Sequence, residues 1–334
     1  MMIATQPFKI IYFGSPEFAV PALAQLYEQP TLAQIVCVVS QPDKPQGRGK
    51  QMAPCPVKQL AMQRGLKTFT PHTLKTADVQ EELRQYGADF FIVAAYGKIL
   101  PQAVLDLPTY GCLNLHASCL PLYRGASPIH QAILNGDTHT GLALMKMEAA
   151  LDTGPVYQIL TCPIQNIDTT ASLTQTLAYL GAQVLIEQLA PIASGRCQAK
   201  PQDHTQATYT QKIKKEDGLI NWQLSVSAID RHIRAYYPWP VSYTFLNKKR
   251  IQIIQARPDT DIHTKKTEQK NLDTPAPGTL YRRDSRCLLV ACAQGQYLEI
   301  ERLKPEGKKE MSAQDFILGY WQDKNQILQF TNQP

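Results

Sequence analysis

Short apolar runs alternate with amphipathic segments along the first two hundred residues. The wholly apolar run at residues 90–95 has the length of a buried strand, and shorter apolar runs recur between segments whose apolar residues have helical spacing. We predict strands at residues 9–13, 35–39, 67–69, 90–95, 111–116 and 142–147, and helices at residues 17–29, 57–63, 78–86, 127–134 and 170–189. This alternation predicts an α/β fold built on a Rossmann-like, mostly parallel sheet with helices on both faces.

The pattern changes after residue 190. Residues 191–207 combine proline and glycine with polar residues, which is typical of a linker. Beyond them we predict one helix, at residues 225–235, and short strands at residues 241–246, 251–255, 287–291 and 298–303. We therefore expect a sheet domain at residues 1–190, a linker at 191–207 and a small β-barrel domain at 208–334.

Composition excludes several classes of protein. Hydrophobic residues make up 44% of the chain and charged residues 19%, and the mean hydropathy is -0.26, as in globular proteins. No apolar run reaches the roughly 18 residues of a membrane-spanning helix, and residues 1–8 lack the features of a secretory signal. We expect a cytoplasmic protein that has no membrane partner and needs no obligate protein partner.

Cysteines and glycines argue against bound metals and common redox cofactors. The eight cysteines form no Cys-x-x-Cys pair and lie beside no histidine cluster, so we predict no metal site. The Gly-x-Gly-x-x-Gly loop is missing after the first strand, and a nicotinamide or flavin cofactor is therefore not supported. Five of the six net positive charges fall beyond residue 200, which favours an acidic partner for the second half.

Asn114, His116 and Asp152 form the candidate catalytic group. Side chains alternate between the faces of a strand, so Asn114 and His116 project from the same face of strand 111–116. Ligands of open parallel sheets bind beyond the carboxyl ends of the strands. We expect strand 142–147 to run toward the same edge and to deliver Asp152 beside His116.

These three residue types suit acyl transfer without a covalent enzyme intermediate. An asparagine can donate a hydrogen bond to an oxygen that gains negative charge, and a histidine can exchange a proton with the reacting groups. A nearby carboxylate fixes the tautomer of the imidazole ring. Ser118 lacks the Gly-x-Ser-x-Gly turn that presents a nucleophilic serine.

Residues 114–128 and 151–154 together form a specific motif. They read Asn-Leu-His-Ala-Ser-Cys-Leu-Pro-Leu-Tyr-Arg-Gly-Ala-Ser-Pro and Leu-Asp-Thr-Gly. This string resembles that of the folate-dependent formyltransferases, which move a formyl group from 10-formyltetrahydrofolate to an amine, and the likeness extends over about residues 8–310. The resemblance implies that Asn114, His116 and Asp152 are the catalytic trio and that the second domain resembles an oligonucleotide-binding (OB) barrel that helps to hold tRNA.

The resemblance also implies where the folate donor binds, without any metal. The implied folate-binding residues follow two strands and are Ala95, Tyr96, Gly97, Ser118, Cys119, Leu120 and Pro121. Two positions depart from the family pattern. Cys119 stands where the family usually has leucine, and Ala150 stands where it commonly has glycine. If the backbone at Ala150 needs a positive φ, alanine is disfavoured there.

A basic loop distinguishes branches of the family. Gly-Arg-Gly-Lys at residues 47–50 is typical of the branch whose acceptor is initiator methionyl-tRNA. The resemblance implies that Lys44, Arg48 and Lys50 contact tRNA, through phosphates or a base edge. Read alone, the same loop is a solvated surface loop.

Several alternatives share part of this pattern. A formyltransferase acting on an amino sugar nucleotide would keep the trio and differ in loop 41–50. Purine-pathway formyltransferases resemble residues 1–200 alone, and a formyltetrahydrofolate hydrolase would not need a basic second half. A non-catalytic RNA-binding protein on the same scaffold would not need all three polar side chains.

Overall fold

The computed structural model of the chain describes residues 6–46, 49, 51–259, 275–321, 323 and 326–333. These residues form two compact units, which we describe separately. Unit 1 comprises Met1–Pro128, His139–Pro163 and Ser172–Gln211, and unit 2 comprises Ile129–Thr138, Ile164–Ala171 and Lys212–Pro334. In the described ranges, every helix is too short or too polar to cross a membrane.

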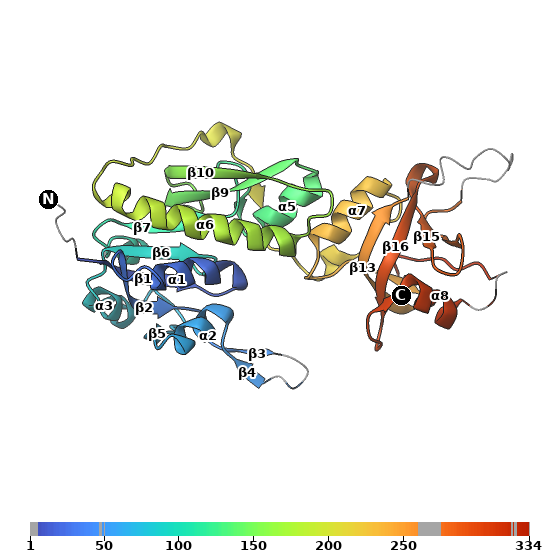
Figure 1. Ribbon diagram of the computed structural model, residues 1–334, viewed down its shortest axis with the longest axis horizontal. Helices are drawn as coiled ribbons and strands as arrows, with labels where there is room; N and C mark the ends of the chain where they lie inside the picture. Colours follow the sequence, from blue (N-terminus) through green and yellow to red (C-terminus); the bar gives the residue numbers. More distant parts are fainter. Residues whose placement is uncertain are drawn as a thin grey trace. The chain divides into compact units, whose positions relative to one another are not determined.

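Unit 1 is built on one seven-stranded sheet (Figure 1). Its strands, in chain order, are β1 (Phe8–Gly14), β2 (Ala33–Val39), β5 (Thr68–Phe69), β6 (Phe90–Ala94), β7 (Cys112–His116), β9 (His139–Lys146) and β10 (Val156–Pro163). Their spatial order is β10-β9-β7-β6-β1-β2-β5, and the five strands from β7 to β5 are parallel. The predicted mostly parallel sheet is confirmed.

Helices cover both faces of this sheet. They are α1 (Val20–Tyr27), α2 (Pro56–Gln63), α3 (Ala77–Gln85), α4 (Gln102–Leu105) and α6 (Thr170–Ala193), and a short 3-10 helix, η1 (Glu17–Ala19), precedes α1. Helix α5 (Pro128–Asn135) belongs, apart from its first residue, to unit 2. Alternate residues of β1 point to the two layers of helices. Ile11 and Phe13 belong to a hydrophobic core that includes residues of α3 and α4. The Tyr12 hydroxyl, on the other face, donates to the carbonyl of Ala19, the residue that precedes α1. In Figure 1, α6 crosses in front of the strands.

The direction of β9 differs from the prediction. β9 pairs antiparallel with β7, with Asn114 opposite Met145 and His116 opposite Ala143, so its carboxyl end lies at the start of β7. β10 then pairs antiparallel with β9. The expectation that this strand runs toward the same edge as β7 is wrong, because a strand's hydrophobic pattern fixes which faces are buried and carries no information on direction.

The segment predicted as a linker is also more structured than expected. Helix α6 continues past Pro191 to Ala193, and unit 1 includes the chain as far as Gln211. Within this stretch lie a 3-10 helix, η2 (His204–Gln206), and a short strand, β11 (Tyr209–Thr210), which pairs with β8 (Arg124–Gly125). The boundaries at 190 and 207 therefore do not coincide with the edges of the two units.

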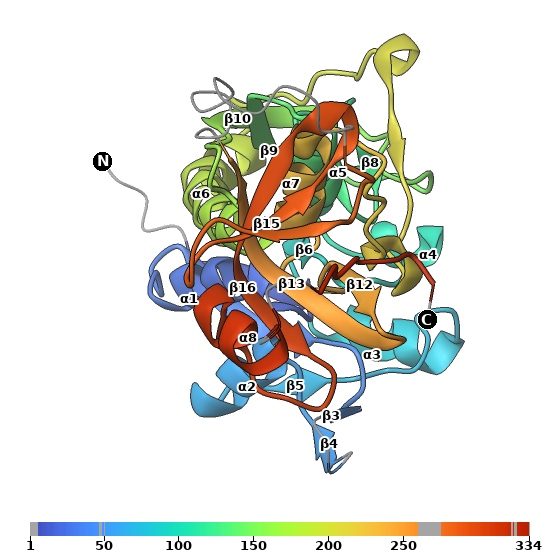
Figure 2. The same cartoon turned by 90° about the vertical axis from the view of Figure 1, so that its right-hand side faces the viewer.

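Unit 2 is built on a second, antiparallel sheet. Its strands are β12 (Tyr243–Leu246), β13 (Lys249–Pro258), β14 (Leu280–Arg282), β15 (Leu288–Ala291), β16 (Tyr297–Pro305) and β17 (Met311–Ser312). They follow the order β12-β13-β16-β15-β14, with β17 beside β16. Figure 2 shows the curl of this sheet, and α7 (Val226–Ala235) and α8 (Ala313–Tyr320) pack against it. Two 3-10 turns, η3 (Glu216–Gly218) and η5 (Ala293–Gly295), complete the unit.

The end of the chain joins both edges of this curled sheet. Phe245 in β12 exchanges two backbone hydrogen bonds with Thr331, and beside β14 the amide of Phe330 donates to the carbonyl of Gly278. Residues 328–331 thereby satisfy edge groups that would otherwise be open to pairing with another chain. The core beneath contains Trp222, whose ring stacks on Phe330 at 5.6 Å.

Candidate active site

His116 and Asp152 meet in unit 1. The distance between His116 Nδ1 and Asp152 Oδ2 is 3.6 Å, and both side chains are largely buried. The other ring nitrogen, Nε2, lies 3.0 Å from the carbonyl oxygen of Tyr123. A carbonyl oxygen only accepts, so Nε2 must carry a hydrogen. Nδ1 therefore faces the carboxylate either as the acceptor nitrogen of a neutral ring or as the second donor of an imidazolium.

Asp152 reaches His116 because the chain turns back between β9 and β10. The Lys146 amide donates to the Pro155 carbonyl, and Gly154 passes so close to Lys146 that a Cβ there would lie 1.9 Å from its carbonyl oxygen. One carboxylate oxygen, Oδ2, accepts from the Gly125 amide at 2.8 Å. The backbone of Asp152 has φ +53°, whereas Ala150 is outside the left-handed region. The alanine in place of glycine at 150 therefore introduces no strain of that kind.

The Asn114 carboxamide is held in place and left free of protein partners. Leu115, on the opposite face of β7, lies against Gly181 of α6, so Asn114 and His116 share the other face as predicted. Asn114 is 9% exposed, yet among the described residues none donates to or accepts from its side chain. A nearly buried amide without a partner is costly unless a ligand supplies one.

The loop after β6 contains three of the predicted folate-binding residues. Ala95 and Gly97 are exposed and both have positive φ, +46° and +76°. Tyr96 between them is 1% exposed and packs edge-on against Phe13, so only its backbone is available to a ligand. Gln41 fixes the loop by donating to the Tyr96 carbonyl at 2.8 Å. Glycine suits position 97 because of this positive φ, and a Cβ there would also displace the Gln41 amide nitrogen, which lies 2.6 Å from its position.

The predicted folate residues after β7 are divided between core and surface. Ser118 is fully buried, and its hydroxyl donates to the Leu122 carbonyl at 2.6 Å, which closes a turn. Leu120 belongs to a small apolar cluster on β9 and β10. Cys119 and Pro121 are half-buried, and the Cys119 sulfur lies close to Gly141 in β9.

The remaining candidates are the three basic residues of the predicted tRNA-binding loop and a cysteine of β7. Lys44, in the hairpin of β3 (Lys44–Gln46) and β4 (Gln51–Ala53), is exposed and donates to the Gln41 side chain at 2.6 Å. Arg48 and Lys50 lie outside the described residues. Burial raises the pKa of the Cys112 thiol to about 12, so this cysteine beside the site is no nucleophile at neutral pH.

Sequence reasoning missed two residues of the site, Arg124 and Gln202. Arg124 is 1% exposed, and its guanidinium donates to the side-chain amide oxygen Oε1 of Gln202 at 2.7 Å and to His204 Nδ1 at 2.9 Å. Gln202 in turn donates to the carbonyl oxygens of Asp152 and Gly154, at 2.9 and 2.7 Å. Arg124 lies inside the quoted motif, but Gln202 lies in a polar stretch that has no periodic or motif signal.

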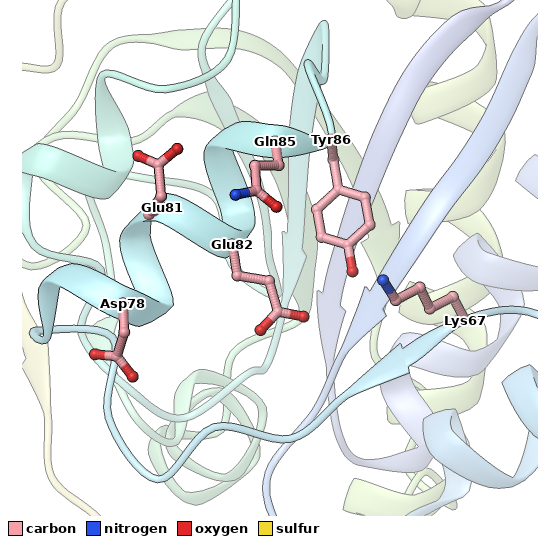
Figure 3. A pocket seen from close by; sticks show the side chains of 6 residues that line it. All are labelled: Lys67, Asp78, Glu81, Glu82, Gln85 and Tyr86. Atoms are coloured by element: carbon pink, nitrogen blue, oxygen red, sulfur yellow. The ribbon is translucent and has the colours of Figure 1, made fainter.

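Two surface hollows lie elsewhere. One, of about 510 Å³, is formed by α3 and Lys67, whose ammonium group lies over the ring of Tyr86 (Figure 3). The other, of about 920 Å³, belongs to unit 2 and is lined by α7, β13 and neighbouring segments. Neither hollow contains a predicted site residue. Among the described residues, no three His, Cys, Asp or Glu side chains are grouped so as to hold a metal ion.

Comparison with known proteins identifies the family of the chain. Residues 8–189 match the formyl transferase family, and residues 212–320 match the formyl transferase C-terminal domain. The chain belongs to the formyl transferase family. The resemblance to the formyltransferases that the motif indicated is confirmed.

Individual proteins that resemble the chain support its assignment to the formyl transferase family. The methionyl-tRNA formyltransferase of Pseudoalteromonas translucida (strain TAC 125) is 42% identical over 94% of this chain and 95% of that protein. The protein of the same name from Dehalococcoides mccartyi (strain CBDB1) is 44% identical over 93% and 95%. The N-formyltransferase of Helicobacter canadensis, solved with folinic acid and dTDP-3-aminofucose, has a TM-score of 0.62 at 17% identity, over 88% of this chain and 98% of that one.

Proposed function

We propose that this formyl transferase moves the formyl group of 10-formyltetrahydrofolate to the α-amino group of initiator methionyl-tRNA. The observation that carries the proposal is identity of 42–44% over nearly the full length of both chains to proteins named methionyl-tRNA formyltransferase. The sugar formyltransferase that shares the fold is only 17% identical. The product, N-formylmethionyl-tRNA, serves translation initiation.

The free Asn114 carboxamide stabilises the developing charge. The amino group attacks the formyl carbon and gives a tetrahedral intermediate, whose oxygen gains negative charge. A donor aimed at such an oxygen contributes roughly 3–4 kcal/mol in acyl-transfer enzymes. Asn114 suits this role because its amide is positioned on β7 and has no described protein partner to give up.

His116 and Asp152 move the proton that must leave the attacking nitrogen. A free α-amino group has a pKa of about 7.7–8.0, and esterification of the carboxyl lowers it, so a neutral fraction is available at physiological pH. The attacking nitrogen becomes positively charged and must lose a proton, while the departing folate nitrogen must gain one. The close pair of imidazole and carboxylate, 3.6 Å apart, can carry this proton.

We further propose which residues hold the two substrates. The exposed backbone at Ala95 and Gly97, together with Cys119 and Pro121, borders the folate donor. The basic loop with Lys44, Arg48 and Lys50 contacts the acceptor stem of the tRNA through phosphates or a base edge. The barrel-like unit 2 contains residues 212–334, a part of the chain with an excess of positive charge, which suits an RNA partner.

The decisive experiment offers the purified protein 10-formyltetrahydrofolate and one acceptor at a time. The acceptors are initiator methionyl-tRNA, an elongator methionyl-tRNA, a dTDP-amino sugar and water alone, and the product is followed by mass spectrometry and by release of tetrahydrofolate. We expect formylation of the initiator tRNA. Transfer to the sugar nucleotide without transfer to tRNA, or folate hydrolysis alone, contradicts the proposal.

A further inference from the structure

Residues 200–210, which we call the strap, are fixed to unit 1 at both ends. At one end, Lys200 and Val156 exchange two backbone hydrogen bonds of 2.8 Å. At the other, the Thr208 carbonyl accepts from the Arg124 amide at 2.9 Å, and β11 pairs with β8. A connection with this many backbone bonds to one unit is part of that unit. The strap therefore has a defined position relative to the loop of Asp152.

Gln202 bridges the strap and the Asp152 loop in only one orientation of its amide. The amide NH2 donates to the carbonyl oxygens of Asp152 and Gly154, and the amide oxygen accepts from Arg124. Rotating the amide by 180° would place its oxygen against two carbonyl oxygens and its NH2 against a guanidinium, which only donates. All three contacts together fix the amide.

The burial of Arg124 is explained by this orienting role. The guanidinium is 1% exposed, and no described carboxylate lies within ion-pair distance of it. Its acceptors are the neutral groups of Gln202, His204 and Tyr209. A buried cation without a carboxylate is costly, so its presence indicates a use other than general stability.

The Asp152 loop needs such support. Its backbone φ of +53° is unfavourable for a non-glycine residue and persists only when the surroundings enforce it. Gln202 donates to the backbone carbonyl of Asp152 and to that of Gly154 two residues further on, while the Gly125 amide holds the Asp152 carboxylate. Only with that backbone fixed does the carboxylate stay 3.6 Å from His116.

We propose that Gln202, oriented by Arg124, is a positioning residue for the reaction: it holds the Asp152 carboxylate beside His116. The inference rests on the proposed function, because it assumes that the His116–Asp152 pair moves the proton. Gln202 itself touches neither substrate, so its loss changes the rate of the chemical step rather than the affinity for either substrate.

The test compares two changes of Gln202 with a matched control on the strap. Gln202→Glu keeps the size and the acceptor for Arg124 but removes both donors to the loop, and Gln202→Asn keeps the amide but is too short to bridge. We expect kcat to fall about 10- to 100-fold in both, as for small misplacements of catalytic groups. We expect each KM to stay within about threefold. The unsatisfied buried groups should lower the melting temperature by a few degrees, and the protein should still be folded at the assay temperature.

Gln206→Glu is the control, since it makes the same amide-to-carboxylate change four residues along the strap. Gln206 is exposed, and within the described part of the chain its side chain hydrogen-bonds to Asp203. We expect its kcat to equal that of the unchanged protein. Unchanged kcat in both Gln202 variants overturns the inference, and so does a loss of kcat that parallels a loss of melting temperature and recurs in Gln206→Glu.

Asp152→Asn, measured in parallel, separates this inference from the proposed function. An inactive Asp152→Asn beside fully active Gln202 variants contradicts the positioning role alone. An active Asp152→Asn contradicts the proposed role of the carboxylate itself, and the positioning role is then overturned with it.

Discussion

Buried polar groups are handled differently in the core of unit 2 and at the site of unit 1. In unit 2 the Trp222 indole donates to the Thr244 hydroxyl, which donates to the Thr331 carbonyl, and both ring nitrogens of His232 have partners within 3.0 Å. In unit 1 the Asn114 carboxamide has no partner among the described residues. These three side chains of unit 2 thus have their hydrogen-bonding groups paired within the fold, whereas the Asn114 side chain of unit 1 is available to a substrate.

Backbone strain follows the same division. In unit 2 the consecutive residues Asn247 and Lys248 have φ of +50° and +63°, the conformation of the tight turn that joins β12 to β13. In unit 1 the strained non-glycine residues Ala95, Tyr123 and Asp152 all lie in loops at the candidate site. Strain in the first case closes a hairpin, and in the second it directs groups toward the reacting atoms.

The largest effect that tests this contrast is expected from Asn114→Ala. We expect kcat to fall about 10²- to 10³-fold, the usual result of removing one oxyanion donor. Because the side chain makes no hydrogen bond within the described structure, we expect only a small change in the free energy of unfolding. Steady-state kinetics and urea unfolding measure the two quantities, and tRNA affinity by filter binding serves as the control. A loss of stability without a loss of kcat would contradict this prediction, because it would mean that Asn114 serves folding rather than catalysis.

Local patterns predicted most of the sheet in unit 1. Strands β1, β6 and β7 are fully apolar or regularly alternating, and burial on both faces leaves that signal. Strand β10 was missed because it lies at the edge of the sheet and carries exposed polar residues such as Thr161. Helix α8 was also missed, although Ser312 and Asp315 form a capping box at its start.

Features that depend on distant contacts could not be predicted. The sheet of unit 2 is joined by residues 328–331, which pair with strands more than forty residues earlier in the chain. The same limit applies to the site: the motif predicted that His116 and Asp152 meet, but the meeting depends on an antiparallel β9 and a returning loop. Gln202 contributes through one amide, and a single contact leaves no pattern in the sequence.

The second prediction concerns the pH dependence of unit 2. Burial lowers the pKa of His232 to about 4, so the folded protein keeps this ring neutral while the unfolded chain takes up a proton below about 6.5. Stability is therefore complete above pH 6.5 and falls as the pH drops toward 4, by about 2–3 kcal/mol from this residue.

Urea unfolding at a series of pH values, followed by the fluorescence of the three tryptophans, which all lie beyond residue 211, measures this loss. Burial also lowers the pKa of His130, so the matched variant His232→Gln is needed to isolate one residue. We expect this variant to lose most of the slope between pH 6.5 and 4. If stability depends on pH as steeply in His232→Gln as in the unchanged protein, then His232 does not link folding to pH.

The third prediction removes one satisfied hydroxyl from unit 2. Thr244→Val keeps the shape of the side chain but leaves the Trp222 indole without its acceptor, while the Thr331 carbonyl keeps only the Phe245 amide as a donor. An unsatisfied buried group costs about 1–3 kcal/mol, so we expect a loss of about 2 kcal/mol in the free energy of unfolding. Thr244→Ser, which keeps the hydroxyl, is the control and should lose less.

The smallest expected effect comes from the same substitution at Thr140, in β9 of unit 1. Its hydroxyl is buried and has no hydrogen-bond partner among the described residues. Thr140→Val therefore removes a polar group that loses its hydration on folding and gains no hydrogen bond in exchange. Valine also favours strands, and we expect a gain of about 1 kcal/mol in the free energy of unfolding. Urea unfolding of Thr140→Val beside Thr244→Val gives the comparison directly. Two losses of equal size would show that hydrogen-bond satisfaction does not distinguish these two sites, whereas opposite signs would show that it does.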